Sequence, residues 1–191
     1  MIGSIAPVYN LGASAAPQLR FSPATLSGIF QGAIKRWSDP AIAADNPGMA
    51  LPDTAISVVR RSDGSGTTLN FSTYLSRMDA NWSKTSGAGA TLKWTTGKGV
   101  KGSSEMARAV AGTDGAIGYL ETGQARRAGL KIGMVRNEAG NFVAPTAPSV
   151  MAAARGIVSG LGAGQAAAES YPLTSPFYVV MKRQNASPSD N

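Results

Sequence analysis

A short segment in the first half of the chain combines residue types that hold a small anion. Arg61 and Asp63 precede the run Ser65, Gly66, Thr67. Arginine carries a forked, permanently charged head that matches the oxygens of an oxyanion. Glycine lets backbone amides approach a ligand closely, and hydroxyl side chains add donors. The spacing therefore predicts a binding site for one small tetrahedral anion.

The elements around this segment would aim further donors at the same point. The β-branched run at 56–59 predicts a strand, and a helical pattern of apolar residues begins after Gly66. The first turn of a helix has N–H groups without partners inside the helix, and its dipole adds roughly half a positive charge there. A second interpretation stays open, in which Asp63 or Ser65 only caps the helix.

The remaining pattern alternates strands and helices, which predicts an α/β fold with a mixed or parallel central sheet flanked by helices. Serine or aspartate followed by proline marks two helix starts, at Ser22 and Asp39, and Ser103 or Ser104 is expected to cap another helix. Further strands are expected at 4–10, 115–120, 131–135 and 176–181, and further helices at 122–128 and 147–158.

The glycine-rich stretch 97–102 is expected to form a structural turn rather than a nucleotide loop. It lacks the Gly-Lys-Ser/Thr ending and follows no clear strand. Trp37, Trp82 and Trp94 are expected to pack in or beside the core.

The composition excludes several kinds of chemistry. The 191 residues include no cysteine and no histidine, so disulfides, thiolate zinc sites and a histidine base are absent. Ser65 at a tight turn resembles a hydrolase serine, but it lacks the Gly-x-Ser-x-Gly pattern and a base. We therefore expect no enzyme, metal or cofactor. The net charge of +7 attracts anions, yet the basic residues are scattered and do not predict nucleic-acid binding.

The sequence contains no recognisable targeting signal. Its first nineteen residues carry no charged side chain, but Pro7, Asn10 and Gly12 break any apolar core and no basic segment precedes it, so a signal peptide is not predicted. The uncharged stretch at 139–154 is interrupted by Pro145 and Pro148, departing from the pattern of a membrane span.

Several motifs together resemble the periplasmic phosphate-binding proteins that serve phosphate ABC transporters. The segment 61–67 (Arg-Ser-Asp-Gly-Ser-Gly-Thr) carries the strongest likeness. The segments 8–11 (Val-Tyr-Asn-Leu), 115–119 (Gly-Ala-Ile-Gly-Tyr) and 171–173 (Tyr-Pro-Leu) follow the family in order and spacing. The resemblance covers about residues 3 to 181. It implies that the chain forms a single lobe of a type II periplasmic-binding-protein fold. Residues 1–183 would be the family's second lobe together with its hinge-crossing strands, and residues 184–191 a disordered tail.

By this resemblance, Arg61, Ser65, Gly66 and Thr67 bind inorganic phosphate, and Asp63 holds the Arg61 guanidinium in place. The partner is the membrane permease of an ABC phosphate importer, and the compartment is the periplasm or the cell surface. The family's first lobe, which carries the other phosphate ligands, has no counterpart in this sequence. The alternative is therefore a truncated lobe that binds ligand weakly or not at all, and that self-associates through the face the other lobe would cover.

Overall fold

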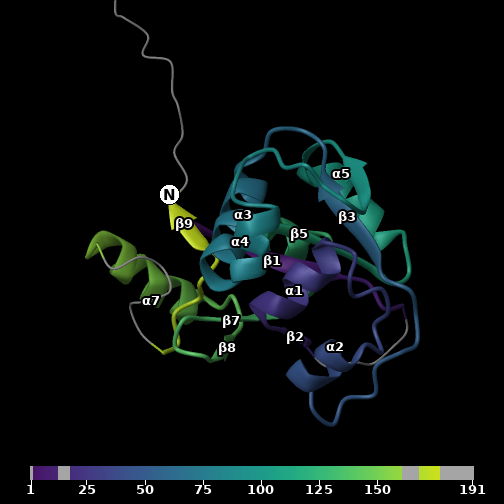
Figure 1. Ribbon diagram of the computed structural model, residues 1–191. Helices are drawn as coiled ribbons and strands as arrows, with labels where there is room; N and C mark the ends of the chain where they lie inside the picture. Colours follow the sequence, from purple (N-terminus) through teal and green to yellow (C-terminus); the bar gives the residue numbers. More distant parts are fainter. Residues whose placement is uncertain (1, 13–17, 161–167, 177–191) are drawn as a thin grey trace, which may run out of the picture.

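A mixed sheet runs through the computed structural model of the protein, which describes residues 2–12, 18–160 and 168–176 (Figure 1). The strands β3 and β4 are parallel to each other, β3 is also parallel to β5, and β1 runs antiparallel to each strand that it pairs with. The order is β4 (Lys98–Val100), β3 (Ser57–Arg61), β5 (Ala116–Glu121), β1 (Ile2–Tyr9) and β6 (Lys131–Ile132), and β9 (Thr174–Pro176) also pairs with β1. The predicted mixed α/β architecture is confirmed.

A second, smaller sheet lies beside the first. It holds β2 (Arg20–Phe21), β7 (Met134–Arg136) and β8 (Phe142–Val143), in that order. Phe21 is fully buried and packs edge-on against Tyr9 of β1, so this small sheet shares the core of the large one.

Seven helices stand between the strands in the part of the chain described. They are α1 (Pro23–Phe30), α2 (Pro40–Asp45), α3 (Gly66–Met78), α4 (Ala80–Thr85), α5 (Gly102–Ala111), α6 (Thr122–Arg127) and α7 (Ala147–Val158). The predicted caps at Ser22 and Asp39 are confirmed, because each side chain accepts a backbone N–H from the first turn of its helix and a proline follows. The helix predicted at 147–158 has those bounds in the structure.

Two neighbouring residues of β5 show how helices cover both faces of the sheet. Tyr119 stacks on Phe71 of α3, with ring centroids 4.6 Å apart. A Cβ atom added to Gly118 would lie 2.7 Å from the sulfur of Met106 in α5. Because successive side chains of a strand point to opposite faces, α3 and α5 lie on opposite sides of β5. The glycine lets α5 approach the sheet closely.

The core is rich in aromatic residues on the α3 side of the sheet. Phe30, Phe71, Trp94 and Tyr119 form a connected group of ring contacts. Trp37 and Trp82 are fully buried and Trp94 packs against the core, as expected from the sequence.

Three local expectations were wrong. The helix α5 begins at Gly102 and has no side-chain cap, so neither Ser103 nor Ser104 caps it. The stretch 97–102 contains the strand β4 rather than only a turn. The strand expected at 131–135 is split into β6 and β7 at Gly133, where a Cβ atom would lie 2.6 Å from the Phe21 ring.

Some expectations fall where the structure describes little or nothing. Of the strand expected at 176–181, only Pro176 lies within the described residues, as the end of β9. The tail expected at 184–191 lies outside them. Among the described helices, none combines the length and apolar character required to cross a bilayer.

Candidate anion-binding site

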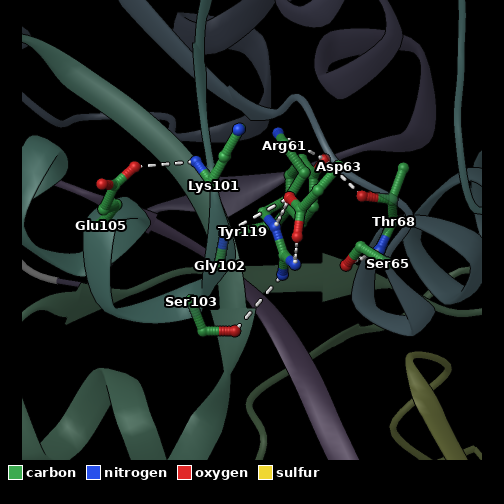
Figure 2. A network of polar contacts seen from close by, with 9 residues as sticks. All are labelled: Arg61, Asp63, Ser65, Thr68, Lys101, Gly102, Ser103, Glu105 and Tyr119. Carbon is green, nitrogen blue, oxygen red and sulfur yellow. Dashed lines mark hydrogen bonds and ion pairs between the residues drawn. The ribbon is translucent and has the colours of Figure 1, made fainter.

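Arg61 is the last residue of β3, and Asp63 holds its guanidinium from the turn that follows. Arg61 Nε donates to Asp63 Oδ1 at 2.7 Å, and Nη2 donates to Oδ2 at 2.5 Å (Figure 2). The arginine side chain is only 10% exposed, and the aspartate side chain is 34% exposed. A two-point contact of this kind fixes the plane of a guanidinium. Asp63 therefore fixes the plane of the arginine head relative to its own carboxylate.

The guanidinium keeps donors for a ligand. It carries five N–H groups, and the described residues accept three: two by Asp63 and one by Ser103, whose Oγ lies 3.4 Å from Nη1. The two N–H groups left over belong to the terminal nitrogens Nη1 and Nη2. Two such donors match two oxygens of one oxyanion.

Ser65 ends the turn and is the N-cap of α3. Its Oγ accepts the N–H of Thr68 at 3.2 Å, and its own N–H donates to the carbonyl of Ala90 at 3.0 Å. The hydroxyl proton of Ser65 remains available to a ligand, and in Figure 2 the hydroxyl lies on the side of α3 that faces the Arg61 guanidinium. The structure confirms the cap at Ser65 that the second interpretation expected, and this cap leaves the hydroxyl proton for a ligand.

The backbone amides of Gly66 and Thr67 open α3. Among the described residues neither amide has an acceptor, as expected for the first turn of a helix. Gly66 is exposed, and no atom outside its neighbours lies within 4 Å of a Cβ built on it. The amides at this end of α3 are therefore open to a ligand.

Tyr119, one of the residues that the sequence analysis did not assign to the site, ties the strand end to the helix start. Its hydroxyl is 2.8 Å from the hydroxyl of Thr68 and accepts the N–H of Arg61 at 3.2 Å. Tyr119 is fully buried and Thr68 nearly so. The tyrosine belongs to the segment 115–119, and its place in that motif was the only sequence signal for it.

The start of α5 also reaches the site, which the sequence analysis did not predict. Gly102 donates its N–H to Asp63 Oδ1 at 3.3 Å, and Ser103 accepts from Arg61. The N–H of Ser62 donates to the carbonyl of Val100 at 3.0 Å, so the turn after β3 is held against the end of β4.

These contacts and the burial of the site shift the pKa values of three of its groups. Hydrogen bonds from Arg61 hold the pKa of Asp63 well below its usual range, and the same bonds raise the pKa of Arg61. Burial raises the pKa of Tyr119. At neutral pH the pair is therefore an arginine cation and a carboxylate, and the tyrosine is a neutral hydroxyl.

The arrangement supplies donors rather than reactive groups. The guanidinium, the Ser65 hydroxyl and the two amides all offer N–H or O–H, which suits an anion. Within residues 2–12, 18–160 and 168–176, no three acidic side chains gather in a way that could hold a metal ion.

The chain matches a known protein family and several known proteins over most of its length. The family model described as PBP superfamily domain matches residues 1–190. The phosphate-binding protein PstS of Pasteurella multocida is 41% identical over 195 residues, covering 98% of this chain and 57% of that protein. PstS of Xylella fastidiosa is 39% identical over 193 residues, covering 96% and 52% respectively. The chain thus spans little more than half the length of these relatives.

Solved structures show the same fold. A high-affinity periplasmic phosphate-binding protein bound with phosphate is 25% identical and superimposes with a TM-score of 0.64, over 91% of this chain and 54% of that one. An ABC-type phosphate transport receptor from Vibrio cholerae is 20% identical with a TM-score of 0.56, again over 91% of this chain and 54% of that one. The second likeness supports the fold alone. The single-lobe fold expected from the sequence is confirmed.

Proposed function

Because the chain belongs to the PBP superfamily, we propose that it binds inorganic phosphate as part of the solute-binding receptor of an ABC phosphate importer. Arg61, Ser65, Gly66 and Thr67 are the proposed ligands. The proposal includes delivery of phosphate to a membrane permease, and a place in the periplasm or at the cell surface. The names of the relatives, which are phosphate-binding proteins, support it.

One observation carries the proposal more than any other. The Arg61 side chain is nine-tenths buried, is held on one edge by Asp63, and keeps two N–H donors beside a helix start with two open amides. A buried cation that a carboxylate already neutralises needs no further anion for charge balance. Its spare donors need an acceptor that offers several oxygens at once, and a tetrahedral oxyanion supplies them.

The proposed mechanism is reversible capture without bond chemistry. The Arg61 guanidinium takes two phosphate oxygens, while the Ser65 hydroxyl and the amides of Gly66 and Thr67 take the others. The α3 dipole adds to the attraction. Asp63 contributes by fixing the orientation of the guanidinium plane, and not by contacting the ligand.

The test is calorimetric titration with phosphate and with sulfate, on the chain and on Arg61→Ala. Loss of a charged hydrogen-bond partner in a buried site costs about 2–5 kcal/mol, so measurable phosphate binding should be lost. Arg36→Ala is the matched control, because Arg36 also makes a two-point contact with an aspartate, Asp53, but lies on the exposed surface. Phosphate affinity that is equal in all three proteins would refute the assignment.

The same titration tests the alternative drawn from the sequence. A site open to water on one side gives weaker contacts, so a lobe acting alone would bind in about the millimolar range. Sedimentation measurements show whether the chain self-associates. A monomer that binds phosphate tightly would exclude the alternative.

A further inference from the structure

The first two residues of α5 contact both members of the Arg61–Asp63 pair. Ser103 Oγ accepts from Arg61 Nη1 at 3.4 Å, and the Gly102 N–H donates to Asp63 Oδ1 at 3.3 Å. Figure 2 shows Ser103 and Asp63 on different sides of the guanidinium. The pair is thus held by an element that lies about forty residues further along the chain.

Asp63 alone does not fix the position of the arginine head. Its two oxygens bind Nε and Nη2, which sets the plane of the guanidinium but leaves the pair able to swing together on two side chains that begin only two residues apart. Ser103 binds the remaining nitrogen, Nη1, from another element. All three nitrogens of the guanidinium are then bound, two by Asp63 and one by Ser103 of α5. The direction of the two spare N–H groups is therefore fixed.

The hydroxyl of Ser103 is available for this role because α5 does not use it. The N-cap position of α5 is taken by Lys101, which forms no side-chain cap, and its N–H donates to the side chain of Glu105 at 2.8 Å. Ser103 lies two residues further on, so its hydroxyl does not cap the helix. Ser104, the next residue, is exposed and has no hydrogen bond to the pair among the described residues.

The geometry points to Ser103 as a positioning residue of the anion site, which fixes through Arg61 the direction of the two N–H groups offered to phosphate. This inference rests on the proposed function, and adds a residue from a second helix to the machinery on α3 and β3. Ser103 acts through the guanidinium, so its removal should weaken binding without unfolding the protein.

The first test compares Ser103→Ala, Ser103→Thr and Ser104→Ala by phosphate titration and thermal unfolding. One lost hydrogen bond is worth about 0.5–1.5 kcal/mol, so Ser103→Ala should bind phosphate about twofold to twelvefold more weakly. Ser103→Thr keeps a hydroxyl at the same position and should restore the affinity. Ser104→Ala should leave it unchanged, and all three variants should stay folded, with unfolding midpoints within a few degrees of the parent chain's. Equal affinity in Ser103→Ala and the parent chain would overturn the inference.

A second measurement needs no ligand and separates this inference from the proposed function. The Nε–H signal of Arg61 in nitrogen-15 NMR reports how rigidly the guanidinium is held. Ser103→Ala should increase its motion in the phosphate-free chain, and Ser104→Ala should not. If the parent chain bound no phosphate, the proposed function would fail, and an unchanged Arg61 signal in Ser103→Ala would overturn the positioning role independently.

Discussion

The hydroxyl of Tyr119 lies 2.8 Å from the hydroxyl of Thr68 and accepts the N–H of Arg61 at 3.2 Å. One side chain from the middle of β5 therefore joins the end of β3 to the first turn of α3. Both hydroxyls are buried, so water cannot replace either partner. The relative position of the arginine and the helix amides thus depends on a contact inside the core.

Tyr119→Phe should lower the free energy of unfolding by about 1–3 kcal/mol, because it leaves a buried hydroxyl and a backbone N–H without a partner. Urea unfolding followed by fluorescence measures the change. In the double variant Tyr119→Phe/Thr68→Val both hydroxyls are gone. Its loss in the free energy of unfolding should therefore be smaller than the sum of the losses in the two single variants. Strictly additive losses would show that the two hydroxyls do not interact.

The local parts of the site were predictable from sequence because they depend on neighbours in the chain. Ser65 caps α3 through Thr68, three residues on, and Asp63 reaches Arg61 from two residues away. The sequence therefore placed Arg61, Asp63, Ser65, Gly66 and Thr67 on one turn between a strand and a helix, as the structure has them. That these residues bind phosphate stays a prediction.

The non-local parts were not predictable from local pattern. The strand β4 reads Lys-Gly-Val, which is too short and too rich in glycine to predict a strand. It pairs with β3 because Gly99 has no side chain, and a Cβ atom there would lie 3.0 Å from both Arg60 Nη1 and Ser62 Cβ. Once β4 is in place, α5 begins beside Asp63, and Ser103 is used by the arginine instead of by its own helix.

Gly66→Ala separates a structural role of this glycine from a role in ligand binding. A Cβ atom at this position meets nothing within 4 Å, and the backbone does not require glycine. Since alanine favours helix over glycine by about 1 kcal/mol in a helix interior, the stability should stay equal or rise slightly at this first helical position. Phosphate affinity should fall, because the added methyl group stands beside the amide that we propose as a phosphate ligand.

The control for this variant is Gly64→Ala, where an added Cβ atom would only touch Thr91 Oγ1 at 3.9 Å. Calorimetry and thermal unfolding on both variants give the comparison. If Gly66→Ala bound phosphate as tightly as the parent chain, the amides of α3 would not contact the anion closely.

Asp63→Asn should change how stability depends on pH. The pKa of Asp63 is lower in the folded chain than in the unfolded chain, where it is about 3.9. The stabilisation that it contributes is therefore complete above about pH 4 and is lost as the pH falls towards the folded-state pKa. The difference in free energy of unfolding between the parent chain and Asp63→Asn should shrink steadily below about pH 4.

Asp53 is the second carboxyl that must be controlled in this experiment, because hydrogen bonds from Arg36 and Ser38 lower its pKa to about 2. Urea unfolding from pH 6 to pH 2 is therefore best measured in an Asp53→Asn background. A pH-independent difference between the two proteins would mean that Asp63 titrates alike in the folded and unfolded chains.

Gly115→Ala and Gly48→Ala form a matched pair that measures the cost of a steric clash separately from the cost of backbone strain. Both glycines have a positive φ, 74° and 77°, so alanine is strained at either position. At Gly48 nothing lies within 4 Å of an added Cβ atom, and the loss should be limited to about 1 kcal/mol of backbone strain. At Gly115 the Cβ atom would lie 2.3 Å from the carbonyl oxygen of Ala55, so either β5 or the segment before β3 must move.

The Gly115 carbonyl also accepts the indole N–H of the buried Trp37 at 3.0 Å, so the movement would disturb a core contact as well. Gly115→Ala should therefore lose several times more stability than Gly48→Ala, at least about 3 kcal/mol, because overpacking adds to the backbone strain. Urea unfolding of the two variants measures the ratio, and tryptophan fluorescence reports the environment of Trp37. Equal losses in the two variants would mean that the chain relaxes around Gly115 without cost.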